Sequence, residues 1–289
     1  MDLHDHGLAS DLEMMAALVA ERRQVLRWLL AGAAGLPLIS CGGGSDAGTT
    51  AVAGSGAGAN GAGTVATPTV PATGACVVIP EETGGPYPAD GTNTHGGSIV
   101  NVLNQSGVVR SDIRASFNGA TGVAAGVPLT INLQLLNASG GCASLAGYAI
   151  YLWHCDRDGL YSLYSSGVTA QNYLRGVQET DGAGTLSFTT IFPGCYAGRM
   201  PHVHVEVYPS LAKAASAANR IKTSQFTFPM ATLNEAYTAS GYTASVRNLA
   251  QISYATDNVF SDGTSLQMAT VTGSATDGYV VTLSIAVNG

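Results

Sequence analysis

Six short runs of alternating apolar and polar residues constrain the fold of this chain more than any other feature. They span residues 128–137, 148–156, 185–192, 202–209, 223–229 and 279–287, and Gly, Asp and Pro residues that favour turns lie between them. Only residues 210–220 and 232–239 have the pattern of short helices. Strands without long helices between them predict an all-β fold, an antiparallel β-sandwich with long loops and one or two short helices.

The first 40 residues have the pattern of a signal peptide. Arg22, Arg23 and Arg27 precede an apolar stretch over residues 28–39, and residues 38–41 (LISC) resemble the lipobox of bacterial lipoproteins. This pattern predicts export to the bacterial cell envelope, periplasmic or outer surface, with a lipid on Cys41 as the only membrane anchor. An ordinary cleaved signal peptide with an incidental cysteine is the alternative.

Residues 41–75 are rich in Gly, Ala, Ser and Thr, and Asp46 is the only charged residue among them. Such a segment is predicted to be a flexible linker, so the folded domain is expected over residues 76–289. The formal net charge of −7, with no basic run outside the N-terminal segment, argues against nucleic acid as a partner. Whether the chain forms a homo-oligomer is left open by the sequence.

Four cysteines fall within the predicted domain. An even number in an oxidising compartment predicts two disulfides, and the sequence leaves the connectivity open. Buried free thiols are the alternative. These cysteines are Cys76, Cys142, Cys155 and Cys195.

The segment GRMPHVHVEV, residues 198–207, places His202 and His204 two residues apart in an expected strand. Their side chains then leave the same face and can bind one ion. A histidine pair alone is more often only a polar face. Tyr196 precedes this strand and Tyr173 precedes the strand before it, so two tyrosines and two histidines are able to converge.

Five segments in order resemble the intradiol ring-cleaving dioxygenases, the family of catechol and protocatechuate 3,4-dioxygenases. The similarity is greatest to the single-domain secreted and lipoprotein branch of that family. The segments are residues 80–88 (PEETGGPYP), 111–114 (SDIR), 151–165 (YLWHCDRDGLYSLYS), 172–205 and 224–229 (SQFTFP).

The resemblance implies a non-haem ferric ion, Fe(3+), held by Tyr173, Tyr196, His202 and His204, with Tyr173 displaced when substrate binds. Ferric iron is a hard acid that prefers anionic oxygen and favours the deprotonated form of a phenol. The implied reaction cleaves a catechol-type ring between its two hydroxylated carbons and incorporates both atoms of O2, giving a muconate-type dicarboxylate.

The resemblance also implies roles for residues around the iron. Arg199 would be a catalytic cation beside the ring as it gains negative charge, and Gln225 would lie near the ring. A surface salt bridge and an edge-strand amide are the respective alternatives. Tyr151, Tyr161, Tyr164 and His154 are interpreted as structural. The substrate cavity would be lined by Thr83, Gly85, Pro86 and Tyr87.

Two other functions compete with the dioxygenase hypothesis. The first is a non-catalytic envelope β-sandwich module that binds metal or phenolic ligands. The second is a copper or zinc hydrolase built on the HxH pair, which lacks a carboxylate ligand or general base at a recognisable spacing.

Overall fold

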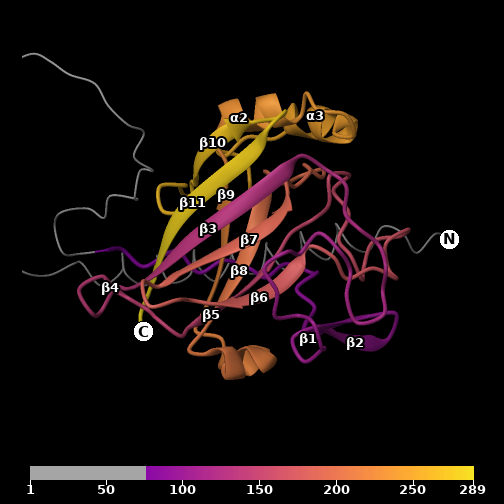
Figure 1. Ribbon diagram of the computed structural model, residues 1–289. Coiled ribbons are helices and arrows are strands. Elements are labelled where there is room, and N and C mark those ends of the chain that lie inside the picture. Colours follow the sequence, from indigo (N-terminus) through magenta and orange to yellow (C-terminus); the bar gives the residue numbers. More distant parts are fainter. Residues whose placement is uncertain (1–75) are drawn as a thin grey trace, which may run out of the picture. The chain divides into compact units, whose positions relative to one another are not determined.

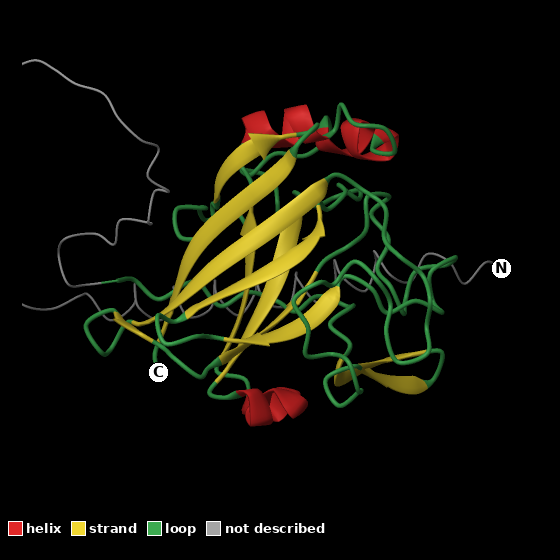
Figure 2. Cartoon of the chain, in the orientation of Figure 1, coloured by secondary structure: helices red, strands yellow, loops and turns green. Residues whose placement is uncertain are grey.

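The computed structural model describes residues 76–289 (Figures 1 and 2). The predicted signal peptide, the lipidation site Cys41 and the predicted linker therefore lie outside the described residues. Within residues 76–289, no helix is long and apolar enough to cross a membrane.

Two β-sheets make up most of the described chain. The larger sheet has the order β10-β11-β3, and both β4 and β7 pair with β3; its strands are β3 (Pro128–Asn137), β4 (Ala143–Ser144), β7 (Thr185–Ile191), β10 (Thr270–Ser274) and β11 (Gly278–Val287). The second sheet has the order β6-β5-β8-β9 and contains β5 (Ala149–Trp153), β6 (Arg175–Glu179), β8 (His202–Tyr208) and β9 (Lys222–Thr227). A separate hairpin is formed by β1 (Asp90–His95) and β2 (Ser98–Asn101).

A shared apolar core joins the two sheets, which overlap face to face in Figure 1. In β3, Ile131 and Leu133 are buried and alternate with partly exposed residues, as the period of two expected for a strand requires. They belong to the same buried cluster as Val203 and Val205 of β8. The predicted all-β sandwich is thereby confirmed.

The second sheet is buried on both faces, because every residue of β5 and β8 is buried. Val203 and Val205 of β8 face the sandwich core, whereas His202 and His204 alternate with them on the opposite side of the strand. Loops cover that outer face, and Trp153 of β5 packs there in a second apolar cluster. The candidate site lies on this loop-covered face.

The strand pairing differs from the prediction at one place. β11 pairs with β3 in parallel, with Tyr279 opposite Leu129, while all other pairs of named strands in residues 76–289 are antiparallel. Alternation within a strand gives the face of each side chain but not the direction of its neighbour, so this pairing had no signal in the sequence.

Two short α-helices lie in the described C-terminal part, α2 (Met230–Ala236) and α3 (Thr243–Leu249). The helical pattern at 232–239 corresponds to α2, and α3 was not predicted. The pattern at 210–220 forms two 3-10 helices, η2 (Leu211–Ala215) and η3 (Ala217–Asn219), because Ser216 between them has an extended backbone and accepts a hydrogen bond from the Ala218 amide.

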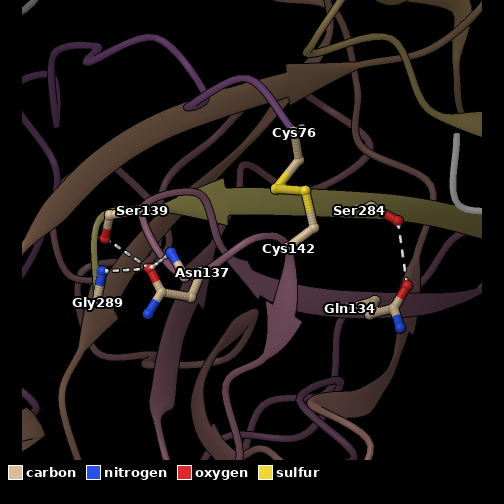
Figure 3. The surroundings of a disulfide bond; sticks show 8 residues. Cys76, Gln134, Asn137, Ser139, Cys142, Ser284 and Gly289 are labelled. Atoms are coloured by element: carbon tan, nitrogen blue, oxygen red, sulfur yellow. Dashed lines mark hydrogen bonds between the residues drawn. A yellow bond between two sulfur atoms is a disulfide. The ribbon is translucent and has the colours of Figure 1, made fainter. Parts of the chain in front are cut away.

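One disulfide, Cys76–Cys142, ties the start of the described chain to the turn between β3 and β4 (Figure 3). In the same region, the Asn137 side-chain oxygen accepts hydrogen bonds from Ser139 Oγ, at 2.8 Å, and from the Gly289 amide, at 3.3 Å. The disulfide and these bonds hold together three segments that are far apart in the sequence: residue 76, residues 137–142 and residue 289.

The second predicted disulfide is absent, because Cys155 and Cys195 are buried free thiols. Each sulfur faces a backbone carbonyl instead: Cys155 Sγ lies 3.5 Å from the Gly194 oxygen, and Cys195 Sγ lies 3.4 Å from the Arg199 oxygen. Burial raises the pKa of the Cys195 thiol to about 12 and raises the pKa of Cys155 well above its ordinary value. Both thiols are therefore protonated at neutral pH.

Candidate metal centre and its surroundings

The two histidines of β8 converge on one point. His202 Nε2 and His204 Nε2 lie 3.1 Å apart, and both rings are buried. His202 Nδ1 lies 2.6 Å from the Met200 carbonyl oxygen, so this nitrogen carries the proton and Nε2 presents a lone pair. The His204 ring stacks on Trp153 with the centroids 4.7 Å apart, which fixes the plane of the imidazole.

Two tyrosine hydroxyls complete the cluster. Tyr161 Oη lies 3.3 Å from Nε2 of each histidine, and Tyr196 Oη lies 3.4 Å from Nε2 of His202. A metal bound about 2.0–2.1 Å from each donor, with bond angles of about 90–110°, separates neighbouring donors by about 2.9–3.4 Å. The four donor atoms therefore fit a single ion.

Cys, Asp and Glu side chains, which also bind metals, do not form a comparable cluster in the described residues. No group of three or more His, Cys, Asp or Glu side chains within residues 76–289 is arranged to hold a metal ion. The phenol oxygens of Tyr161 and Tyr196 are the other side-chain donors that lie within 3.4 Å of the histidine pair. Two phenols and two imidazoles suit ferric iron, because an ion of high charge prefers anionic oxygen.

Burial disfavours the charged forms of Tyr161, His202 and His204. Burial raises the pKa of the Tyr161 phenol well above its ordinary value, and the neighbouring Tyr196 adds to this shift. Burial also lowers the pKa of His202 and His204 well below the ordinary value for histidine. The imidazoles are therefore neutral and ready to bind a cation, whereas the Tyr161 phenol must lose its proton to become a good ligand.

Tyr173 does not join this cluster, so the expected convergence of Tyr173 with the two histidines is corrected. Its hydroxyl donates a hydrogen bond to Asp156 Oδ2 at 3.0 Å. Asp156 Oδ1 in turn accepts from the amides of Asp158 and Leu160, which closes the turn immediately before Tyr161. The tyrosine that meets the histidines is Tyr161, and the signal that could have found it is its position directly after the DRDG turn at 156–159.

A glycine lets the two tyrosine-bearing loops approach each other. Gly159 has φ +83°, and a Cβ added there would lie 3.0 Å from Cβ of Tyr196. The amide of Gly194 donates to the Asp156 carbonyl at 3.0 Å and joins the same two loops. Glycine at position 159 therefore allows this close approach without backbone strain and without a tight contact to Tyr196.

Arg199 is buried, and two side chains engage its guanidinium. Its Nε donates to Asp257 Oδ2 at 3.0 Å, and its Nη2 donates to Gln225 Oε1 at 2.7 Å. Although burial by itself lowers the pKa of the guanidinium, Tyr196 and Asp257 raise it, and the net shift is upward. Arg199 is thus a permanent cation, and its interpretation as a surface salt bridge is wrong.

Gln225 is fully buried on β9, and both ends of its amide are engaged. Its Nε2 donates to the Thr83 carbonyl at 2.8 Å, while its Oε1 accepts from Arg199. Gln225 therefore connects the predicted cavity-lining segment to the arginine. Its amide is not an ordinary edge-strand group.

The segment predicted to line the substrate cavity lies close to the cluster at two positions. The Tyr87 ring centroid lies 4.9 Å from that of Tyr161, and the Thr83 carbonyl contacts Gln225. Gly85 has φ +66°, and its amide bonds to Thr83 Oγ1 at 2.9 Å, while the Pro86 carbonyl accepts a bond from the side chain of Asn93. Gly85 and Pro86 shape the turn that brings Tyr87 beside Tyr161.

Arg175, at the start of β6, is a fully buried residue whose importance was missed. Its Nη1 donates to the carbonyls of Tyr87, at 2.8 Å, and Pro88, at 3.1 Å, and its Nε donates to Ser162 Oγ at 3.1 Å. It therefore links the Tyr87 segment to the residue that follows Tyr161. Arg175 lies in the segment 172–205 that resembles the dioxygenase family, but its partners at 87 and 88 are too far away in the sequence to be predicted from it.

Comparison with known proteins gives one family match and several similar structures. Residues 107–220 match a family model with the description "Dioxygenase". An intradiol ring-cleavage dioxygenase from Tetranychus urticae is similar in structure, with a TM-score of 0.56 and 24% identity over 74% of this chain and 95% of that chain. A second dioxygenase crystal structure has a TM-score of 0.54 and 24% identity, again over 74% of this chain and 95% of the other.

A third solved structure, the dioxygenase domain of a carbohydrate-binding fusion protein from Streptomyces sp. SirexAA-E, has a TM-score of 0.45 and 22% identity over 73% of this chain and 99% of that domain. No curated protein sequence gives a significant match. The resemblance to intradiol dioxygenases is thereby confirmed, for the fold and for the dioxygenase motif region at 107–220.

Proposed function

We propose, from the intradiol dioxygenase fold of this chain, that the protein is a non-haem iron(III) dioxygenase. It would cleave a catechol-type ring between the two hydroxylated carbons with O2 and release a muconate-type dicarboxylate. The observation that carries the proposal is the convergence of Tyr161, Tyr196, His202 and His204, whose donor atoms lie 3.1–3.4 Å from their neighbours.

These four residues would hold the iron. The chemistry that ferric iron supplies when bound is activation of a catecholate ring toward dioxygen. Tyr161 and Tyr196 would give up their phenol protons when a trivalent cation binds, because the field of the cation stabilises phenolate. The neutral imidazoles of His202 and His204 would bind through Nε2 without any change in protonation.

Arg199 would stabilise the negative charge that develops on the substrate ring. Asp257 and Gln225 engage its Nε and Nη2, so that Nη1 is the nitrogen that neither of them binds. A fixed cation in a site with little water lowers the energy of an anionic transition state more than it would in bulk solvent. Tyr87, with its ring 4.9 Å from that of Tyr161, would form one wall beside the substrate.

Export and anchoring form a separate part of the proposal. We infer from the sequence of residues 1–41 that the chain is secreted into the bacterial envelope and anchored by a lipid on Cys41. Mass spectrometry of the membrane fraction should find a lipidated Cys41 as the new N-terminus. Recovery of the protein with residues 1–40 still attached would contradict this inference.

The test of the enzymatic proposal begins with metal-free protein loaded with ferric iron. One equivalent should bind and produce a visible tyrosinate-to-iron charge-transfer band, whereas protein loaded with zinc should stay colourless. Oxygen uptake with a panel of catechols, together with product analysis for dicarboxylates, then identifies the substrate. Coloured protein that consumes no oxygen with any catechol would favour the non-catalytic binding module. Protein that binds iron without the band would show that the tyrosines are not ligands.

A further inference from the structure

Asp257 is a fully buried carboxylate in the C-terminal segment, and all of its contacts are with hydrogen-bond donors. Its Oδ1 accepts from the amides of Val259, at 2.8 Å, and Phe260, at 3.1 Å. Its Oδ2 accepts from the Met200 amide at 2.6 Å and from Arg199 Nε at 3.0 Å. The backbone thus fixes the carboxylate, and the carboxylate in turn fixes the arginine.

We propose that Asp257 is the positioning residue for Arg199, so that the C-terminal segment takes part in assembling the active site. The effect of Asp257 on catalysis rests on the proposed function. The contact between Asp257 and Arg199 is observed in the structure and does not depend on that function. Asp257 would not touch the substrate. It would hold the guanidinium at the angle from which Nη1 can face the ring.

The arrangement of the guanidinium supports this role. Asp257 holds Nε from one side, and Gln225 holds Nη2 from the other, at 2.7 Å. Gln225 is itself held by the Thr83 carbonyl. An arginine with two anchored nitrogens keeps one orientation, whereas an arginine held by Gln225 alone could turn about its side-chain torsions.

Charge balance supports the same conclusion. Arg199 is only 3% exposed, and a buried cation without a partner is strongly destabilising. Asp257 makes the only salt bridge found for Arg199 in the described chain. The partner is supplied from outside residues 107–220, the part that matches the dioxygenase family model. The C-terminal 60 residues therefore do more than extend the sandwich.

The substitution Asp257→Asn is a sharp test because all four partners are donors. An amide of the same size has one acceptor oxygen and one NH2 group, so one of the two donor pairs must face another donor. Asp277→Asn is the matched control, since this aspartate is exposed in the same C-terminal segment and accepts only from Ser274.

The first measurement needs no iron. In metal-free wild-type protein, NMR should show a slowly exchanging Arg199 Nε–H, assigned by its disappearance in Arg199→Lys. We expect the exchange of this proton to accelerate at least tenfold in D257N and to stay unchanged in D277N. A rapidly exchanging Arg199 Nε–H in the wild type would overturn the proposal, even if D257N does not fold.

The second measurement is turnover per bound iron. We expect kcat to fall about 100-fold in D257N, as misplacement of a catalytic group by about 1 Å can cause, with iron content and KM little changed. A merely structural role would reduce the folded fraction but leave kcat per iron unchanged, and that result would refute the positioning role. If the wild type has no dioxygenase activity, the proposed function fails. The exchange rate of the Arg199 Nε–H proton still tests whether Asp257 holds Arg199 in place.

Discussion

The hydroxyl of Tyr173 donates a hydrogen bond to Asp156 at 3.0 Å, and this contact keeps it out of the cluster formed by Tyr161 and the two histidines. Burial and the neighbouring Asp156 carboxylate both raise the pKa of the Tyr173 phenol. A phenol that donates to a carboxylate is held in its protonated form, which is the wrong form for binding a ferric ion. Tyr161, whose hydroxyl faces Nε2 of both histidines, is therefore the better candidate ligand on geometric grounds.

The pair of substitutions Tyr161→Phe and Tyr173→Phe separates these two tyrosines. Y161F should lose the charge-transfer band or shift it strongly, and its iron affinity should fall at least tenfold, because one of four donors is removed. Y173F should retain the band and one equivalent of iron. Visible spectra and metal analysis of both variants provide the measurement, and a normal Y161F spectrum alongside a colourless Y173F protein would reverse the assignment.

Gly159→Ala should disturb the approach of the two tyrosine-bearing loops. Alanine at φ +83° costs about 1–2 kcal/mol in backbone strain, and contact of its Cβ with Tyr196 adds about 1–3 kcal/mol of overpacking. Gly167→Ala is the matched control, because Gly167 has φ +87° with nothing within 4 Å of an added Cβ.

Urea unfolding measures both glycine variants. The free energy of unfolding of G167A should fall only by the cost of backbone strain, and this variant should keep its iron-dependent colour. G159A should be less stable than G167A and should bind iron more weakly. Equal losses in the two variants would show that the contact between position 159 and Tyr196 is unimportant.

His154 should make the fold sensitive to acid. Its ring is buried, its Nδ1 lies 2.7 Å from the Cys155 carbonyl and its Nε2 lies 2.7 Å from Thr190 Oγ1, and burial lowers its pKa from 6.5 to about 4. The unfolded chain therefore takes up a proton more readily than the folded protein. This contribution to stability is complete above pH 6.5 and is lost as the pH falls toward 4.

Urea unfolding at pH 7.5 and 4.5 tests this prediction. Between pH 7.5 and pH 4.5, the free energy of unfolding should fall by about 2–3 kcal/mol more in the wild type than in His154→Gln. This difference follows from the linkage between the pKa of His154 and stability. His95→Gln, in the exposed β1–β2 hairpin, serves as the control and should behave like the wild type. An identical pH dependence in wild type and H154Q would contradict the assignment.

The disulfide between Cys76 and Cys142 should contribute to stability without affecting chemistry. It closes a loop with a sequence separation of 66 residues, for which chain entropy predicts about 4 kcal/mol of stabilisation. The double variant Cys76→Ser/Cys142→Ser should unfold at correspondingly lower urea concentration, and wild type under reducing conditions should match it. Its iron-dependent colour should be unchanged, and loss of the colour would tie the bond to the site.

Much of the architecture could be predicted because the alternation of apolar and polar residues along a strand is a local property of the chain. The runs at 128–137, 185–192 and 279–287 correspond to β3, β7 and β11 within one residue. The short strands β1, β2, β4, β6 and β10 were missed, since a few residues carry too little pattern to stand out. Helix α3 was also missed.

The histidine pair and Tyr196 were found from local spacing combined with family motifs, and the structure brings these three together. Tyr161 was missed because several tyrosines lie close together in residues 151–173, and spacing does not distinguish among them. Asp257 and Arg175 were missed for a different reason. Each acts on a partner far away in the sequence, and a single sequence contains no signal for such a pair.

The sequence by itself determined which side chains could serve as donors and which face of each strand they would occupy, because residue type and strand alternation are local. Only the tertiary structure decided which tyrosine meets the histidines and which carboxylate meets Arg199. Those choices depend on loop closure at Gly159, on the turn that Asp156 and Tyr173 stabilise, and on the return of the C-terminal segment to the site. They are set by packing between distant segments, so they appear only when the chain has folded.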